Sequence, residues 1–366
     1  MVAKQISILN FKNLEQVDLT FSPKMNCFFG NNGMGKTNLL DALFYLSFCK
    51  NHTNLTDSQL IKHDADFCVL QGSYLFEGNR SDEIYCGIKC KHRKIFKRNK
   101  KEYEKLSEHI GLLPLVMISP ADTDLIQGGS DERRKFVDMV ISQYDKLYLQ
   151  SLIRYNKALA QRNSLLKSAD QSSDNALFEI WEEQLTENGR IIHEKRKQFV
   201  TEFLPIFKEF HRFICGSCEN IDLIYQSQLS DTDLMSSLIQ KRERDKILGH
   251  TSIGIHKDDF DFLLDGHLMR KIGSQGQSKT YLIALKLAQF NFLVKTGSSV
   301  PILLLDDVFD KLDAERVEQI VKLVTQDRFG QIFITDTNRK YLDEILNKMN
   351  YDYKLFQVEN GNITEL

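Results

Sequence analysis

Apolar and polar residues alternate with a period of two near the start of the chain. The alternation covers four stretches, residues 4–10, 14–21, 67–77 and 82–90. Phe11-Lys12-Asn13 separates the first pair and Gly78-Asn79 joins the second pair. Alternation around a short polar break is typical of a β-hairpin with one buried face. The first quarter of the chain therefore predicts two hairpins.

Continuous apolar runs appear at four other places, where polar residues do not interrupt the pattern. They are residues 27–29, 115–119, 300–307 and 331–338. Short runs of this kind are expected for strands buried on both faces, as in a parallel sheet covered by helices.

Apolar residues recur at helical spacing from Asp131 to about Phe213, with a polar break at 168–175 and a longer helical stretch at 176–204. Strand patterns return at 220–226 and 251–264. The predicted fold class is α/β, with an inserted, mainly helical lobe. That insert is too short to form a long coiled-coil arm.

A glycine-rich loop lies between the run at 27–29 and a helical stretch at 39–46. Its spacing, G-x-x-x-x-G-K-[ST], in a strand–loop–helix context predicts a P-loop. The backbone N–H groups of such a loop and the positive end of the next helix bind phosphate. Lys36 is expected to reach the β- and γ-phosphates as a catalytic residue, and the Thr37 hydroxyl to bind Mg²⁺. The predicted ATP-binding residues are Gly30, Asn31, Asn32, Gly33, Met34, Gly35, Lys36, Thr37 and Asn38.

Two carboxylates, Asp306 and Asp307, end the apolar run at 300–307. Ligands of α/β sheets bind at the carboxyl ends of the strands. Asp306 is therefore predicted to hold Mg²⁺, and Asp307 to act as the general base that polarises the attacking water.

A second polar loop precedes an amphipathic helix at 280–290 and offers donors at a helix N-terminus. Its residues Ser274, Gln275, Gly276 and Gln277, placed before Asp306, resemble the signature motif of ABC-type ATPases. In that class the signature loop meets the γ-phosphate held by the other subunit of a head-to-tail dimer. Asp313 resembles a D-loop residue, and Thr335 takes the place of the transporters' switch histidine as a γ-phosphate sensor.

The formal net charge is −2, so any nucleic-acid contact must come from a local basic patch. Residues 89–101 carry eight lysines and arginines without an acid. Lysines that protect an exposed hairpin edge are one interpretation of this segment, and phosphate contacts with DNA are the other. The candidate DNA-binding residues are Lys91, Arg93, Lys94, Lys97 and Arg98.

The seven cysteines are scattered, and the Cys86/Cys90 and Cys215/Cys218 pairs fit no standard zinc module. Reduced thiols in a cytosol are the interpretation we favour. No run of 18 apolar residues predicts a membrane-spanning helix, and the first residues lack the apolar core of a signal peptide. A cytoplasmic location without a membrane partner is expected.

Taken together, these motifs resemble the RecF family of bacterial recombination and repair ATPases over nearly the full length. Further matching segments are Phe11-Lys12-Asn13, Ser119-Pro120-Ala121-Asp122, residues 128–138, residues 254–259 and residues 303–313. The chain departs from the family pattern at Ile255, Lys257, Ser278 and Lys279, which affects the signature contacts but not the P-loop.

The resemblance implies an ABC-type P-loop ATPase head in three parts: a first ATPase part at 1–118, a helical lobe at 119–219, and a second ATPase part at 220–366. It further implies ATP and Mg²⁺ as cofactors, an ATP-dependent homodimer with weak hydrolysis, and binding to duplex or gapped DNA. RecR and RecO are the implied protein partners, with which it helps load recombinase.

Three alternatives remain open at this stage. A transporter's nucleotide-binding subunit is disfavoured, because the interval from Lys36 to Ser274 is much longer than in transporters and the switch histidine is missing. A chromosome-organising head needs long coiled-coil arms. Another DNA-repair ABC ATPase is the remaining alternative.

Overall fold

The computed structural model describes residues 1–53, 55–168, 175–216, 219–230, 232–297, 299–309, 312, 314–324, 326, 328–337, 346 and 352–366. The chain divides into two compact units. The first, which we call the sheet unit, comprises residues 1–122, 213–216 and 279–366. The second, the helical unit, comprises residues 123–212 and 217–278.

An antiparallel sheet in the sheet unit confirms both predicted hairpins. Its strand order is β2-β1-β4-β5-β6-β7. Buried residues alternate with partly exposed ones along β4 and β5, as expected for a sheet with one face in the core. The strands are β1 (Val2–Phe11), β2 (Leu14–Thr20), β4 (Phe67–Leu75), β5 (Ser81–Lys89), β6 (Ile95–Arg98) and β7 (Lys101–Glu102).

The second sheet of this unit is parallel apart from its last strand. Its order is β15-β14-β3-β13-β12-β8, with β15 antiparallel to β14. The four apolar runs form four neighbouring strands, β3, β13, β12 and the edge strand β8, and β12 and β13 are buried along their whole length. The strands are β3 (Met25–Phe29), β8 (Leu115–Ile118), β12 (Ile302–Asp306), β13 (Ile332–Asp336), β14 (Tyr353–Glu359) and β15 (Asn362–Glu365).

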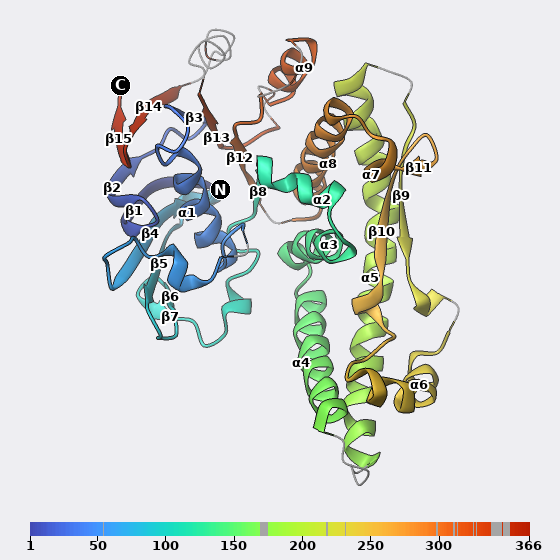
Figure 1. Ribbon diagram of the computed structural model, residues 1–366. Helices are drawn as coiled ribbons and strands as arrows, with labels where there is room; N and C mark the ends of the chain where they lie inside the picture. Colours follow the sequence, from blue (N-terminus) through green and yellow to red (C-terminus); the bar gives the residue numbers. More distant parts are fainter. Residues whose placement is uncertain are drawn as a thin grey trace. The chain divides into compact units, whose positions relative to one another are not determined.

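Helix α1 (Lys36–Phe48) contacts strands of both sheets and is buried along almost its whole length. It appears among these strands in Figure 1. A helix that is apolar on all sides is stable only when it is covered on all sides. This burial fixes the start of α1, and hence the glycine-rich loop, against the parallel sheet. The sheet unit also contains α9 (Ala314–Val324) and most of α8 (Gln275–Thr296).

The helical unit confirms the predicted helical insert, and most of the predicted polar break at 168–175 lies outside the described residues. The unit contains α2 (Asp124–Gln127), α3 (Ser130–Tyr144), α4 (Lys146–Ser168), most of α5 (Asn175–Cys215), α6 (Leu234–Leu248) and α7 (Met269–Ile272). Helix α5 continues through Pro205, where the sequence predicted an end at 204. Its apolar face is buried on both sides of the proline, at Phe199, Phe203, Phe207 and Phe210. This packing outweighs the cost of an interior proline.

A small antiparallel sheet completes the helical unit. It pairs β9 (Ile221–Gln226), β10 (Asp259–Leu264) and β11 (His267–Leu268) in the order β11-β10-β9. The expected strand at 251–264 is wrong in its first half, because residues 255–257 form a 3₁₀ turn. Gly254 has a φ of 128° there, and the left-handed region ends strand geometry.

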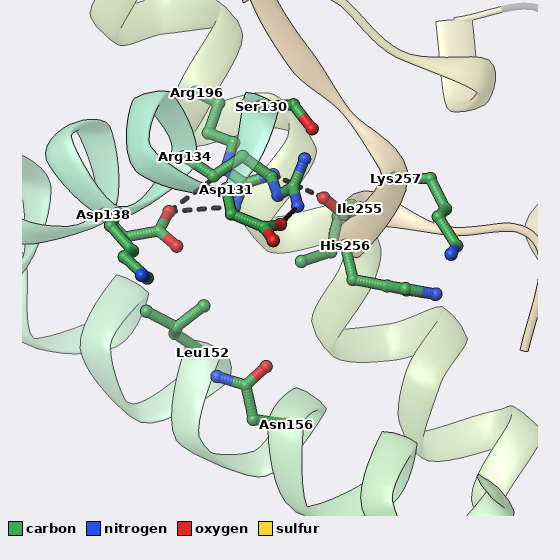
Figure 2. A pocket seen from close by; sticks show the side chains of 11 residues that line it. Ser130, Asp131, Arg134, Asp138, Leu152, Asn156, Arg196, Ile255, His256 and Lys257 are labelled. Atoms are coloured by element: carbon green, nitrogen blue, oxygen red, sulfur yellow. Dashed lines mark hydrogen bonds and ion pairs between the residues drawn. The ribbon is translucent and has the colours of Figure 1, made fainter. Parts of the chain in front are cut away.

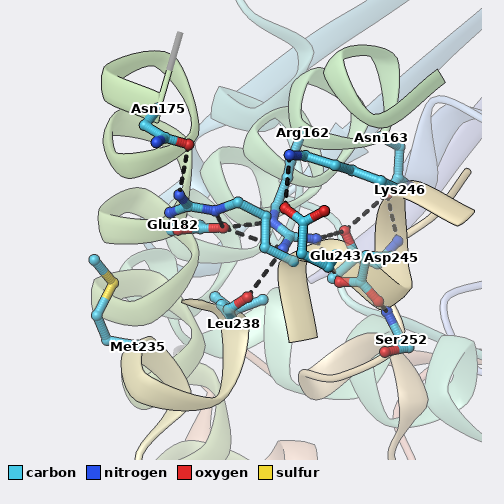
Figure 3. A network of polar contacts seen from close by, with 12 residues as sticks. Arg162, Asn163, Asn175, Glu182, Met235, Leu238, Glu243, Asp245, Lys246 and Ser252 are labelled. Carbon is cyan, nitrogen blue, oxygen red and sulfur yellow. Dashed lines mark hydrogen bonds and ion pairs between the residues drawn. The ribbon is translucent and has the colours of Figure 1, made fainter. Parts of the chain in front are cut away.

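Three helices of this unit meet at the buried guanidinium of Arg162 (Figure 3). Arg162 on α4 contacts Glu182 on α5 at 3.1 Å and Asp245 on α6 at 2.7 Å, and all three side chains are fully buried. Such a cluster is stable only when every charge has a partner. It therefore holds α4, α5 and α6 in one arrangement.

The structure draws the domain boundary differently from the sequence. Residues 220–278, predicted in the second ATPase part, group with the helical unit. The reason is that β9 pairs with β10, and α3 contacts β10. Among the described residues, no helix combines the length and the hydropathy needed to cross a membrane.

Candidate nucleotide-binding site

The glycine-rich loop connects β3 to α1 in the sheet unit. Gly33 and Gly35 have φ angles of 80° and 114°, which side chains disfavour. At Gly30 the constraint is space, because an added Cβ would lie 2.3 Å from the carbonyl oxygen of Val358. The backbone path of the loop therefore depends on glycine at these positions, as a phosphate cradle requires.

Lys36 lies over this loop. Its ammonium donates to the carbonyl oxygens of Gly30 at 2.8 Å and Asn31 at 3.1 Å, and the residue is 4% exposed. A cation held against the loop at the N-terminus of α1 creates a strongly positive spot.

Three segments meet at the carboxylate of Asp306, at the end of β12. The Thr37 hydroxyl donates to it at 2.9 and 3.0 Å, and the Thr335 hydroxyl donates at 2.7 Å from the end of β13. The carboxyl ends of neighbouring parallel strands meet at one sheet edge, which explains the cluster. The structure thus brings the predicted residues Thr37, Asp306 and Thr335 together.

Asp307 follows in a left-handed conformation with a φ of 45°. Its N–H donates to the Thr335 hydroxyl at 3.1 Å and to the Thr335 carbonyl oxygen at 3.3 Å. Its Oδ1 atom is buried without a hydrogen-bond partner among the described residues. A buried, unpaired carboxylate oxygen is unfavourable unless a ligand or water satisfies it.

Burial raises the pKa of Asp306 to about 6, and the nearby carboxylates of Asp307 and Asp41 act in the same direction. The hydroxyls of Thr335 and Thr37 oppose this rise. Negative charges held close together in a buried place attract a cation.

The residues at this edge fit ATP with Mg²⁺. One hydroxyl and one carboxylate oxygen lie within 3.0 Å of each other, and both are hard oxygen ligands of the type Mg²⁺ prefers. Buried oxygens without a hydrogen bond, Asp307 Oδ1 and Asp41 Oδ1, stand beside them in the described chain. The glycine-rich backbone at Gly30–Lys36 beside them is of the type that contacts phosphate.

The sequence did not reveal which residues hold the glycine-rich loop and the start of α1 in place. Lys12 pairs with the buried Asp41, one helical turn after Thr37. Asn13 accepts a bond from the Asn38 amide at 2.7 Å and approaches the Gly33 carbonyl oxygen at 3.4 Å. The spacing of Thr37 and Asp41 at i and i+4 is the signal that could have identified Asp41.

The turn between β14 and β15 also supports the loop. The Gly361 N–H donates to the Met34 carbonyl oxygen at 2.9 Å, and the Asn360 N–H approaches the Met34 sulfur at 3.3 Å. Asn-Gly is a typical hairpin turn, so the turn was recognisable, but its contact with a loop 326 residues earlier was not.

The predicted signature residues belong to the helical unit. Ser274 and Gln277 form a reciprocal cap of α8, with bonds of 2.9 and 3.2 Å between side chains and backbone. The Gln277 amide also donates to Glu219 at 3.0 Å. Ser274 and Gln275 are exposed, so this helix start is accessible, together with Gly276. The D-loop candidate Asp313 lies outside the described residues.

The candidate DNA-binding residues separate into two groups. Lys94 donates to Cys49, Tyr45 and Asp57, and Arg98 pairs with Asp82 at 2.7 Å, so both take part in local structure. Lys91 and Arg93 are exposed, and Lys97 lies 5.6 Å from the ring centre of Tyr85.

Comparison with known sequences gives a match over almost the whole chain. The family described as RecF/RecN/SMC N terminal domain matches residues 2–364. The DNA replication and repair protein RecF of Parabacteroides distasonis is 65% identical over 363 residues, 99% of each chain. RecF of Bacteroides thetaiotaomicron is 61% identical over 366 residues, covering 100% of this chain and 99% of its own.

Solved structures agree. The recombination mediator protein RecF with ATP, of the RecFOR pathway, superposes with a TM-score of 0.89 at 30% identity, covering 100% of this chain and 97% of its own. An Smc head domain from Pyrococcus furiosus gives a TM-score of 0.57 at 17% identity over 100% and 96% of the chains, which is a likeness of fold. These likenesses confirm the predicted α/β fold of an ABC-type P-loop ATPase head with a helical insert.

Proposed function

The chain belongs to the RecF family of DNA replication and repair proteins, and from this premise we propose that it is a weak ATPase that forms an ATP-dependent dimer on DNA. The observation that carries the proposal is the cluster of Thr37, Asp306 and Thr335 beside the glycine-rich loop. This cluster connects the phosphate-binding loop with the ends of β12 and β13. Loss of the γ-phosphate would therefore alter contacts at the edge of the parallel sheet.

The residues of one subunit divide the work as follows. Lys36 and the loop N–H groups bind the β- and γ-phosphates, and Thr37 and Asp306 hold Mg²⁺. Bound Mg²⁺ neutralises charge on the phosphate oxygens. Asp307 accepts a proton from the attacking water, and the Thr335 hydroxyl positions Asp307 through its N–H.

The exposed start of α8 supports the dimer part of the proposal. Ser274 and Gln277 cap the helix, so its N-terminus is already ordered, and Ser274 and Gln275 are exposed there. In a head-to-tail dimer this helix start would face the γ-phosphate bound by the other subunit. ATP then holds the dimer together, and hydrolysis releases it.

The biological part of the proposal follows from family membership. The dimer binds duplex or gapped DNA in the cytoplasm, where it helps RecO and RecR to load recombinase. Lys91, Arg93 and Lys97 are the proposed phosphate contacts, since Lys94 and Arg98 already pair with carboxylates, whereas the exposed Arg93 makes only a 3.4 Å hydrogen bond to the Glu104 carbonyl oxygen. DNA binding is expected to raise the slow ATP turnover.

The substitution Ser274→Arg tests the composite site. The long side chain would occupy the space of the partner's γ-phosphate, so sedimentation velocity with ATP should show monomers where the unchanged protein forms dimers. Affinity for a fluorescent ATP analogue should stay unchanged, because the glycine-rich loop belongs to the other unit. Ser168→Arg places the same side chain at another exposed helix end and serves as the matched control.

ATP-dependent dimers of Ser274→Arg would disprove the role of this helix start. The ATP turnover per subunit, measured against protein concentration with and without gapped duplex DNA, tests the dimer-dependent hydrolysis and its stimulation by DNA. A rate that is independent of concentration and of DNA would leave an ATPase without the proposed dimer or DNA function.

A further inference from the structure

The helical unit contains a cavity of about 510 Å³ that the ATPase reaction does not use. It lies at the start of α3, and the 3₁₀ turn at 255–257 and two residues of α4 complete its wall (Figure 2). Two segments singled out in the sequence, 128–138 and 254–259, therefore meet around one hollow.

Paired arginines hold these two segments together. Arg133 forms a two-pronged ion pair with Asp259 at 2.7 and 2.9 Å and donates to the Gly128 carbonyl oxygen at 2.8 Å. Arg134 donates to the carbonyl oxygen of Asp258. Arg133 is 3% exposed, so this bracing is buried and the shape of the cavity is fixed before any ligand binds.

The acidic side chains of the cavity are already neutralised. Asp131 pairs with Arg134, and Asp138 accepts from Arg196 at 2.9 Å and from the Tyr148 hydroxyl. Arg196 is 1% exposed and also donates to the Ile255 carbonyl oxygen at 2.8 Å. These paired side chains form the bottom of the cavity, which we call its floor. Because each carboxylate has an arginine partner, the floor carries no net negative charge.

Two lysines at the rim remain available. The Lys257 ammonium makes no hydrogen bond or ion pair with any described residue, and Lys257 is exposed. Within the described part of the chain, Lys135 pairs only with the partly exposed Glu132, and exposed pairs of this kind contribute little to stability. The cavity therefore has a cationic rim above a neutral floor.

Uncharged donors complete the lining. The Ser130 hydroxyl stands in the first turn of the fifteen-residue helix α3, whose N-cap Gly129 offers no side chain to bind the free N–H groups. The Asn156 side chain reaches the cavity from α4, as Figure 2 shows. Lysine, serine, asparagine and a helix N-terminus are the donors that proteins use for DNA phosphates.

We propose that this cavity binds a backbone phosphate of DNA, as an anion site separate from the glycine-rich loop. This inference deepens the proposed function and rests on its DNA-binding part. The phosphate is held by Lys135, Lys257, Ser130 and the start of α3, and such contacts fix the position of the duplex without reading its sequence.

The sharpest test is a pair of substitutions at one position, Ser130→Glu and Ser130→Gln. A carboxylate in the first turn of a helix does not destabilise it, because the helix dipole favours negative charge there. Ser130→Glu should therefore keep its melting temperature but repel phosphate. Fluorescence anisotropy with a labelled duplex, in the presence of ATP, should show about tenfold weaker binding than Ser130→Gln.

Salt dependence gives a second, independent readout. The double variant Lys135→Gln/Lys257→Gln should lower the slope of log K against log salt by about 1 to 2 units. Lys167→Gln/Lys241→Gln removes the same charge from the same unit outside the cavity and serves as the control. Unchanged binding of ATP in both double variants would show that the nucleotide site is intact.

The outcomes separate this inference from the proposed function. DNA binding by the unchanged protein, with equal affinity and slope in the cavity variants and controls, overturns the cavity alone. Absence of any DNA binding by the unchanged protein refutes the proposed function and the DNA assignment together. In that case, calorimetric binding of inorganic phosphate that Ser130→Glu abolishes would assign the cavity to a free phosphate instead.

Discussion

At the scale of single residues, Thr335 connects the two carboxylates of the nucleotide site. Its hydroxyl donates to Asp306 and accepts from the Asp307 N–H. Thr335→Val keeps the shape but removes both bonds. Because a hydrogen bond to a charged group contributes about 1.5–3 kcal/mol, single-turnover ATP hydrolysis should slow roughly ten- to a hundredfold.

Nucleotide affinity should change little in Thr335→Val, since Lys36 and the loop are untouched. Thr364→Val, on the exposed strand β15, is the matched control and should hydrolyse ATP at the unchanged rate. A Thr335→Val variant with normal hydrolysis would exclude Thr335 from the reaction.

Asp122, also a single residue, makes the stability of the fold depend on pH. Burial alone raises its pKa, but the ammonium of Lys286 at 2.6 Å and the imidazole of His52 at 3.3 Å lower the pKa to about 2. A carboxyl group with a depressed pKa stabilises the fold above its unfolded pKa of 3.8, and this contribution is lost as the pH falls through 2.

Lys286→Met should therefore cost on the order of 3 kcal/mol of unfolding free energy at pH 7, because Asp122 stays buried without its main partner. The cost should shrink toward pH 4, where the unpaired carboxyl group takes up a proton. Urea unfolding at both pH values measures this difference, and Lys295→Met, exposed near the end of the same helix, is the control. A cost that is equal at both pH values would contradict the ion-pair account.

At the scale of elements, the β14–β15 turn supports the glycine-rich loop. Gly361 has a φ of 81°, and an added Cβ would lie 2.4 Å from the Asn13 carbonyl oxygen. Gly78 has a similar φ of 74°, but a Cβ there meets nothing within 4 Å. Gly78→Ala should cost about 1 kcal/mol for the backbone conformation alone.

Gly361→Ala should cost more, roughly 2–4 kcal/mol, because the clash adds to the backbone term. It should also weaken ATP binding, since the turn donates to Met34 within the loop. Chemical denaturation and a titration with fluorescent ATP compare the two variants. Equal costs for Gly78→Ala and Gly361→Ala would show that the close approach is unimportant.

Elements with a local pattern were predictable from the sequence, and elements that depend on distant contacts were not. The hairpins, the four buried strands and the P-loop follow from period and spacing over a few residues. The continuation of α5 through Pro205 depends on packing along the whole helix, and local propensity cannot reveal it.

The candidate site shows the same division. Thr37 and Asp306 were predictable because each belongs to a motif with its own spacing. The partners of the loop, Asn13 and Gly361, come from opposite ends of the chain, so their contact with the loop arises only from the fold. The grouping of residues 220–278 with the helical unit likewise depends on strand pairing between β9 and β10.

At the scale of the whole molecule, each unit has a core of its own. Phe28, Phe333 and Phe356 stack between strands of the sheet unit. Arg162 and its partners form the buried polar centre of the helical unit. Units with separate cores unfold separately unless a large interface couples them.

Arg162→Met tests this division. Removing the guanidinium leaves Glu182 and Asp245 buried and unpaired, which costs about 3–5 kcal/mol. In differential scanning calorimetry one transition, that of the helical unit, should shift to lower temperature while the other stays in place. ATP should raise the transition temperature of the sheet unit in both the unchanged protein and Arg162→Met, because a ligand stabilises the unit that binds it.

Arg154→Met, at an exposed position of the same helix, controls for the loss of one arginine and should move neither transition. If Arg162→Met lowered both transitions equally, the two units would unfold as one cooperative body. The separate cores of the two units would then not give them separate folding transitions.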